Sequence, residues 1–137
     1  EGFIEDPLHP HFRKADGSIH ICLLQDDGPQ RAVCPFCGHD SDHFAGYKTR
    51  TVQTLPIMGA TPWFHIRSRR YRCDNPECQT STFTVLSEGF RVFQHRSDQL
   101  NITVLAISTF CSDKAAEIIC RESGIAISHD SIRRLLD

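Results

Sequence analysis

The chain has 137 residues, of which 39% are hydrophobic and 23% are charged, and its formal net charge is −2. These values are typical of globular domains and exclude collagen, coiled coils and intrinsically disordered chains. No apolar run is longer than four residues, so neither a membrane-spanning helix nor a secretory signal is expected. The sequence begins with Glu1, and we expect it to be a piece of a longer protein.

The charges are distributed unevenly along the chain. Residues 1–45 carry three basic and eight acidic side chains, residues 46–97 carry eight and three, and residues 98–137 carry four and six. A basic segment between two acidic flanks indicates nucleic-acid binding, although a solvated basic face would give the same pattern.

The first part of the chain has the pattern of a small β unit. Residues 1–17 show little periodicity and are expected to form an arm. Short alternating segments bounded by Gly, Pro, Asn and Asp then predict strands and tight turns. The expected elements are strands at residues 19–24, 52–57, 63–72 and 83–85, turns at residues 26–29 and 58–60, and a connector at residues 89–97.

Four of the seven cysteines form two close pairs. Cys34 and Cys37 are separated by two residues and Cys73 and Cys78 by four, with 35 residues between the pairs. This spacing is typical of a zinc ribbon, in which two tight turns hold one tetrahedral Zn²⁺. Four thiolates leave no position for water, so we expect a structural metal rather than a catalytic one. A redox-active pair or four unrelated thiols is the alternative.

The remaining cysteines and two nearby histidines have simpler expected roles. An odd number of cysteines without a secretory signal favours a reducing compartment. We expect Cys22, Cys111 and Cys120 to be buried, inert thiols. His39 and His43 follow the first pair and are expected to be surface or hydrogen-bonding residues rather than metal ligands.

The predicted strand before the second cysteine pair is rich in arginine. In an extended chain, Arg67 and Arg69 point to one face and Arg70 and Arg72 to the other, unless a bulge interrupts the strand. Arginine donates bidentate hydrogen bonds to phosphate, so we expect these residues, with Lys48, to contact a DNA backbone. Alternatively, the long side chains cover a small sheet while their charged ends remain in water.

From Asp98 onward, the hydrophobic period indicates three helices. Candidate N-caps are Asp98 for the first helix, Ser112 or Asp113 for the second and Ser128 for the third. The short connection at residues 123–128 contains a glycine, as in helix-turn-helix units. An ordinary three-helix bundle is the alternative. The third helix has an apolar side and a polar side, and its DNA-binding candidates are Ser128, His129, Asp130, Ser131, Arg133 and Arg134.

The order of these motifs is similar to that of a known family. The knuckle CPFCG, the segment LPIMG, RRYRCDNPEC running into TFT, and SDKAAEIICRESGIAISHDSIRRLL together resemble the N-terminal region of ISL-three-type insertion-sequence transposases. The resemblance covers residues 33–137. It implies Cys34, Cys37, Cys73 and Cys78 as zinc ligands, a DNA-reading helix at residues 128–136, and a catalytic domain with three carboxylates that would follow residue 137.

We therefore expect an α+β fold with an N-terminal arm at residues 1–17. A small antiparallel zinc ribbon is expected at residues 18–88, followed by a connector at residues 89–97 and a three-helix helix-turn-helix unit at residues 98–137. The expected function is binding to the terminal inverted repeats of a mobile element, with no catalysis by this fragment. A transcription regulator with the same two parts, or a module for dimerisation, is the alternative.

The expected ligands and surroundings follow from that function. They are one structural Zn²⁺, double-stranded DNA and a second copy of the chain, with no small-molecule substrate and no membrane. The expected location is the bacterial cytoplasm, in association with the nucleoid.

Overall fold

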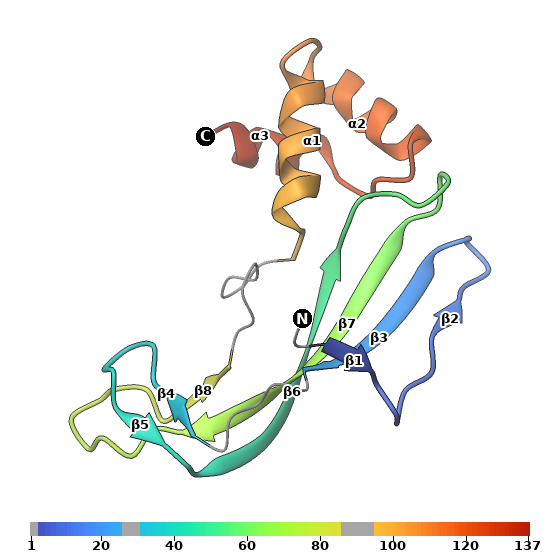
Figure 1. Ribbon diagram of the computed structural model, residues 1–137. Coiled ribbons are helices and arrows are strands. Elements are labelled where there is room, and N and C mark those ends of the chain that lie inside the picture. The colour runs from blue at the N-terminus through green and yellow to red at the C-terminus, as the bar shows by residue number, and fades with distance from the viewer. Residues whose placement is uncertain (1–2, 26–30, 86–94) are drawn as a thin grey trace. The chain divides into compact units, whose positions relative to one another are not determined.

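The computed structural model describes residues 3–25, 31–85 and 95–137, which have an α+β structure with three helices at the C-terminal end (Figure 1). The expected α+β class is confirmed. No helix in this part of the chain is long and apolar enough to cross a membrane. The turn expected at residues 26–29 and most of the connector at residues 89–97 lie outside the described residues.

The elements are β1 (Phe3–Glu5), β2 (Phe12–Arg13), β3 (Ile19–Gln25), β4 (Ala32–Val33), β5 (Asp40–Ser41), β6 (Phe44–Gln53), β7 (Pro62–Arg72), β8 (Thr82–Thr84), α1 (Asp98–Ser108), α2 (Asp113–Glu122) and α3 (His129–Leu136).

Most of the described strands belong to one sheet. Its order is β1-β3-β7-β6, with β2 also paired to β3 and β8 to β7, whereas β4 and β5 form a separate pair. Along β7, the buried positions Ile66 and Ser68 alternate with less buried neighbours, but the next buried position is Tyr71. The alternation of buried and less buried positions therefore shifts by one residue between Ser68 and Tyr71. This shift is the interruption that a bulge in the arginine-rich part of β7 would cause.

The N-terminal segment contains two short strands that the sequence pattern did not predict. β1 pairs antiparallel with β3, with Ile4 opposite Leu24, and β2 pairs antiparallel with the same strand, with Phe12 opposite His20. The Phe12 ring stacks on the His20 imidazole, with the ring centroids 4.5 Å apart. Strands of two or three residues are too short to show a period in the sequence, so pairing with β3 determines them.

β6 and β7 are joined by a tight hairpin turn. The amide of Ile57 donates to the carbonyl of Ala60 (3.0 Å), and the amide of Ala60 donates back to Ile57 (2.9 Å). The expected turn at residues 58–60 is thereby confirmed. The strand expected at residues 52–57 lies earlier in the chain, because β6 begins at Phe44 and ends at Gln53.

All three helices begin at a serine N-cap. The hydroxyl oxygen of Ser97, rather than that of Asp98, accepts the amide hydrogen bond at the start of α1, and Ser112 and Ser128 cap α2 and α3. α2 ends at Glu122, and Gly124 follows two residues later with a φ of +90°, which is readily adopted only by glycine. Paired hydrogen bonds from the amides of residues 124 and 125 back into the last turn complete the glycine C-cap.

The chain divides into two compact units, each assembled from separate stretches of sequence. β3, β6 and β7 contribute residues to both units. The first unit contains Glu1–Pro10, Cys22–Arg50 and His65–Val92, and the second contains His11–Ile21, Thr51–Phe64 and Phe93–Asp137.

Each unit has its own hydrophobic cluster. In the first unit, Ala32, Cys34, Tyr71 and Phe83 are buried together, and the other paired cysteines pack against them. In the second unit, the buried cluster comes from the helices and from the chain between α2 and α3, and Leu55 from the β6–β7 connection packs against it. Its buried members are Leu100, Val104, Ala116, Cys120, Ile125 and Ile132.

Candidate metal centre and nucleic-acid interface

The first cysteine pair lies on the turn between β4 and β5. The amide of Gly38 donates to the carbonyl of Cys34 (2.9 Å), and the amide of Cys34 donates to the carbonyl of His39 (2.9 Å). Gly38 has a φ of +76°, a left-handed conformation that glycine adopts without steric cost. These bonds close a tight turn that carries Cys34 and Cys37.

The second cysteine pair follows directly after β7. The amide of Cys73 donates to the carbonyl of Ser81 (2.9 Å), and the amide of Cys78 donates to the carbonyl of Asn75 (3.1 Å). The Asn75 side chain accepts a further hydrogen bond from the amide of Glu77 (3.1 Å), which is a typical asparagine turn. The sequence between the two cysteines thus favours the loop that holds them.

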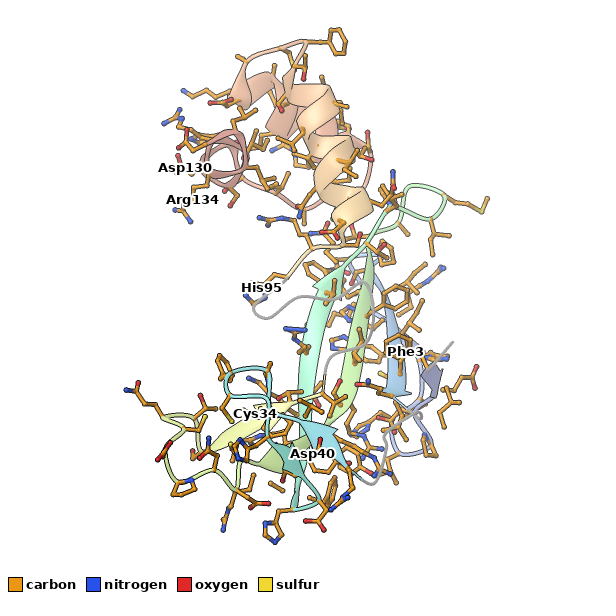
Figure 2. All side chains as sticks on the ribbon, turned by 60° about the vertical axis from the view of Figure 1, so that its left-hand side comes forward. Phe3, Cys34, Asp40, His95, Asp130 and Arg134 are labelled. Atoms are coloured by element: carbon orange, nitrogen blue, oxygen red, sulfur yellow. The ribbon has the colours of Figure 1, made fainter. Side chains whose placement is uncertain are left out.

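The two turns bring the four thiols together. The Sγ atoms of Cys34, Cys37, Cys73 and Cys78 all lie within 4.8 Å of one another, and none of these cysteines forms a disulfide. In a tetrahedral site with Zn–S bonds of about 2.3 Å, neighbouring sulfurs are about 3.8 Å apart. The cluster therefore fits one structural Zn²⁺, and the predicted metal and ligand set agree with this geometry. Figure 2 marks the site at Cys34.

The thiols of the cluster differ in how readily they ionise. The backbone amide of His39 is the largest influence on Cys37 and helps lower its pKa to about 6. The amide of Asn75 lowers the pKa of Cys73, but burial and the neighbouring thiols outweigh it and raise that pKa to about 12. Four thiolates cannot share this space without a compensating cation, and a bound Zn²⁺ supplies that charge.

The metal site is also part of a hydrophobic cluster. Tyr71 is 1% exposed, and its ring stacks on that of Phe83 with the centroids 6.1 Å apart. Ala32 and Cys34 complete the buried set. Because so few large apolar side chains are buried here, the metal has a direct structural role in the first unit.

His43 lies beside this site but has a different partner. Its Nδ1 hydrogen bonds with the Asp74 carboxylate, and Asp42 is close to both. All three residues are exposed. His43 thus has the hydrogen-bonding surface position expected from the sequence.

Arg67 is the most constrained of the predicted phosphate contacts. Its Nη2 donates to Oδ1 of Asp6 (2.7 Å) and its Nε to Oδ2 (2.9 Å). The side chains are only 14% and 3% exposed, and hydrogen bonding to Arg67 holds the pKa of Asp6 far below its usual range. The guanidinium also lies over the Tyr47 ring, 4.6 Å from its centroid. With its planar fork occupied by Asp6, Arg67 is the least suited of the four β7 arginines to phosphate binding.

The other predicted phosphate contacts differ in their exposure. Lys48 and Arg72 are exposed, whereas Arg69 and Arg70 are partly buried. Arg70 donates from Nη2 to the hydroxyl of Thr82 on β8 (3.0 Å). The structure therefore gathers these four basic residues in the first unit, on β6 and β7.

α3 has the two-sided character expected from its sequence. Ile132 is buried in the helical core, whereas Asp130 and Arg134 are exposed and project from the same side of the helix (Figure 2). The Ser128 hydroxyl accepts from the amide of Ser131 (3.2 Å) at the start of the helix.

Two of the predicted DNA contacts hold α3 against α2. Oε2 of Glu117 hydrogen bonds with Nδ1 of His129 (2.6 Å) and accepts from its amide (3.1 Å), which lowers the pKa of Glu117. Nε of Arg133 donates to Asp113 at 3.3 Å. His129 and Arg133 are therefore engaged at the α2–α3 contact, and Arg134 is the basic side chain of α3 left without an ion pair among the described residues.

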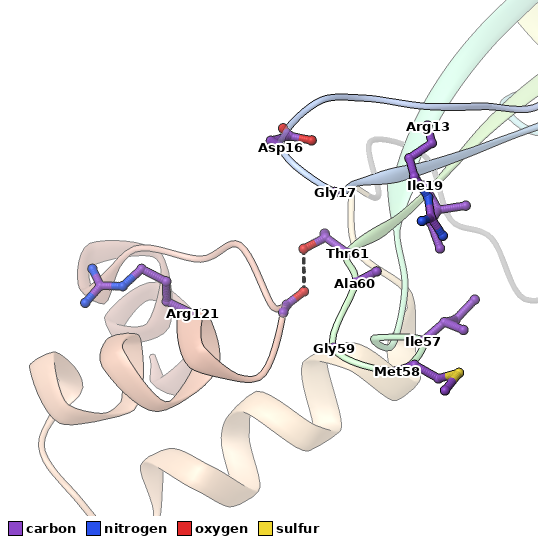
Figure 3. Close-up of a pocket in the computed structure, with 11 residues that line it drawn as sticks. Arg13, Asp16, Gly17, Ile19, Ile57, Met58, Gly59, Ala60, Thr61 and Arg121 are labelled. Atoms are coloured by element: carbon purple, nitrogen blue, oxygen red, sulfur yellow. Dashed lines mark hydrogen bonds between the residues drawn. The ribbon is translucent and has the colours of Figure 1, made fainter.

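The chain between α2 and α3 is held by the β6–β7 hairpin, which sequence reasoning missed. The Gln53 side chain makes two hydrogen bonds with the backbone of Ala126, and the Thr61 hydroxyl donates to the carbonyl of Gly124 (2.6 Å; Figure 3). The Gly59 carbonyl lies so close to Gly124 that a Cβ there would be 2.4 Å from its oxygen. No local sequence signal marks these contacts, because Gln53 lies in a mostly polar stretch and its partner is 73 residues away.

The four-thiol cluster has the ligand set of a zinc finger. Residues 30–78 match the family model of the zinc finger of transposases IS204, IS1001, IS1096 and IS1165. The match spans all four clustered cysteines, so the resemblance inferred from the sequence is confirmed for this segment. Comparisons with curated proteins and with solved structures give no match.

Proposed function

We propose that this chain is a DNA-binding region of a transposase and recognises the terminal inverted repeats of a mobile element. The observation that carries the proposal is the match of residues 30–78 to a transposase zinc finger, with all four cysteines gathered in one cluster. A closed shell of four sulfurs supports a structural role for the metal.

We assign sequence recognition to α2, the following turn and α3, acting as a helix-turn-helix. Three features support this assignment. The connection is short and ends α2 at a glycine, Ile132 anchors one side of α3 in the core, and Asp130 and Arg134 project from the exposed side. A capped helix N-terminus with an exposed polar side suits insertion into a major groove. Arg134 would donate to a guanine through O6 and N7.

We assign backbone contacts to the basic residues of the first unit. Lys48 and Arg72 are exposed, and Arg69 and Arg70 lie on the same strand as Arg72. Phosphate contacts of this kind fix the position of a protein on DNA without reading its sequence. Arg67 would serve these residues indirectly, because its pairing with Asp6 fixes β7 to the N-terminal segment.

The proposal is tested by titrating the zinc-loaded chain with a duplex from an element terminus and with a scrambled duplex, over a range of salt concentrations. We expect tighter binding to the terminal repeat and a logarithmic loss of affinity with salt on both duplexes. Equal binding to both would contradict sequence recognition. Failure to bind either duplex, together with a stable dimer, would favour the dimerisation module.

A further inference from the structure

An open pocket of about 650 Å³ lies beside the zinc cluster in the first unit. Its floor includes Tyr71, which belongs to the hydrophobic cluster around the cysteines. Its lining combines aromatic rings with charges of both signs, supplied by Arg31, Asp42, Phe44, Tyr47, Arg69 and Tyr71. Neither the zinc site nor the proposed recognition helix uses this pocket.

Two exposed aromatic rings of β6 meet at the pocket because the strand is locally irregular. Phe44 and Tyr47 are three residues apart, and in a regular strand they would point to opposite faces. Gly46 between them has a φ of +99°, which interrupts the extended geometry. The two ring centroids are 5.3 Å apart in an edge-to-face arrangement, although the side chains are 51% and 42% exposed.

Arginines support both rings. The guanidinium of Arg67 lies over Tyr47 and is held there by Asp6, and that of Arg69 lies over Phe44 with 5.6 Å to the ring centroid. Each ring is thus held by a cation while a large part of it remains accessible to solvent. Such exposed, supported rings are typical of stacking surfaces for nucleobases.

The charges at the pocket match the remaining parts of a nucleotide. Arg31 is exposed and Arg69 contributes a second guanidinium, and these groups suit a phosphate. Asp42 is exposed and offers a carboxylate that can accept from the exocyclic amino group of a base. An apolar peptide would not need two guanidinium groups, and a phosphate alone would not need two exposed rings.

We propose that this pocket binds one unstacked nucleotide of DNA, with its base against Phe44 and Tyr47 and its phosphate near Arg31 and Arg69. Bases inside a duplex are covered by their neighbours, so only an unpaired or flipped nucleotide offers a free face. The inference rests on the proposed DNA-binding function and adds a preference for DNA with a local unpaired base.

The test compares a fully paired duplex with the same duplex carrying one unpaired deoxycytidine, whose exocyclic amino group can donate to Asp42, by fluorescence anisotropy with the zinc-loaded full chain. We expect the unpaired base to strengthen binding about tenfold, and Phe44→Leu or Tyr47→Leu to remove most of that gain. Phe36→Leu is the matched control, because Phe36 is 65% exposed and does not line the pocket. Unchanged zinc content in each variant shows that the first unit is intact.

The outcomes separate the pocket from the DNA-binding proposal itself. Equal binding of the paired and unpaired duplexes by the unmodified chain would overturn the pocket assignment and leave duplex binding in place. Failure to bind either duplex would contradict the proposed function, and a short oligodeoxycytidylate then tests the pocket alone. Oligodeoxycytidylate binding that Tyr47→Leu abolishes would support the pocket. Nucleic-acid binding that neither aromatic substitution alters would instead favour a protein ligand.

Discussion

The side chain of Gln53 and the backbone of Ala126 hold each other through two hydrogen bonds. Nε2 of Gln53 donates to the Ala126 carbonyl (2.9 Å), and the Ala126 amide donates to Oε1 of Gln53 (2.8 Å). Gln53 is 2% exposed, and its own amide and carbonyl bond to residues 95 and 97. One buried residue at the end of β6 therefore fixes both the entry to α1 and the turn before α3.

Replacing Gln53 by leucine should destabilise the second unit. Leucine has a similar volume but cannot pair with the Ala126 amide and carbonyl, so we expect a loss of about 1–3 kcal/mol in the free energy of unfolding. Urea titration followed by circular dichroism measures this loss. Gln99→Leu, at an exposed position of α1, should change stability by less than about 0.5 kcal/mol. Equal effects of the two substitutions would contradict the role of Gln53.

Gly124→Ala should be more destabilising than Gly17→Ala. Both glycines have positive φ angles, +90° and +86°, so each substitution carries the cost of a left-handed alanine, about 1 kcal/mol. Only at Gly124 would the new Cβ meet backbone, 2.4 Å from the Gly59 oxygen, whereas the space at Gly17 is open. We expect a further loss of about 1–3 kcal/mol at Gly124. Thermal unfolding of the two variants compares them directly, and equal melting temperatures would refute the close approach.

Cys78→Ser should abolish stoichiometric zinc and unfold the first unit. Removing one ligand opens the four-sulfur shell, and the surrounding cluster has few other large apolar groups to replace it. Metal analysis and amide hydrogen exchange of β7 and β8 measure the two effects. Cys111→Ser, at a residue packed against the helical cluster of the second unit, should keep its zinc. A Cys78→Ser protein with a full equivalent of zinc and protected strands would contradict the assignment.

The pairing of Asp6 with Arg67 should make stability depend on pH. Because the folded pKa of Asp6 lies below its unfolded value of about 3.9, its contribution is complete at neutral pH and is lost as the pH falls below about 4. Asp6→Asn leaves Arg67 buried without its carboxylate and should cost about 3 kcal/mol at neutral pH.

The difference between Asp6→Asn and the unmodified chain should therefore shrink in acid. Urea unfolding at neutral pH and below the ordinary aspartate range measures it. Glu122→Gln, at an exposed position of α2, is the control and should have little effect at either pH. A destabilisation by Asp6→Asn that is the same at both pH values would show that the ion pair is not its cause.

Arg134→Ala should weaken binding to the terminal repeat by about 1–3 kcal/mol and affect a scrambled duplex much less. The reason is the exposed position of Arg134 on α3, where it has no ion-pair partner in the described part of the chain. Arg133→Ala is the comparison, because Arg133 is held by Asp113 and should affect both duplexes similarly. Electrophoretic mobility shift titrations give the four affinities. Equal losses on both duplexes with Arg134→Ala would exclude base reading by this residue.

The parts of the molecule that follow local chemistry could be predicted from the sequence. The paired cysteines lie on turns that Gly38 and Asn75 stabilise locally, so their spacing alone indicated one metal site. The serine cap of α3 and the glycine end of α2 are equally local signals, and both agree with the structure.

Features that depend on contacts distant in sequence could not be predicted in this way. Arg67 has the same local pattern as its neighbouring arginines, and only the pairing of β1 with β3 brings Asp6 to it. Ile119 has the helical spacing of a core residue, yet it is 44% exposed. Gln53 looked like a polar residue in a strand, and its partner at residue 126 is visible only in the folded chain.

The interleaved arrangement of the chain restricts how this protein can change during evolution. The second unit draws on three separate stretches of sequence, and the hairpin residues that hold the α2–α3 turn precede that turn by more than sixty positions. A single recombination event that exchanged only the helices would separate α3 from Gln53 and Thr61. New target specificities should therefore arise by point substitution on α3, or by exchange of a longer segment. That segment would begin before the first cysteine pair, so that it carries both this pair and β6 together with the helices.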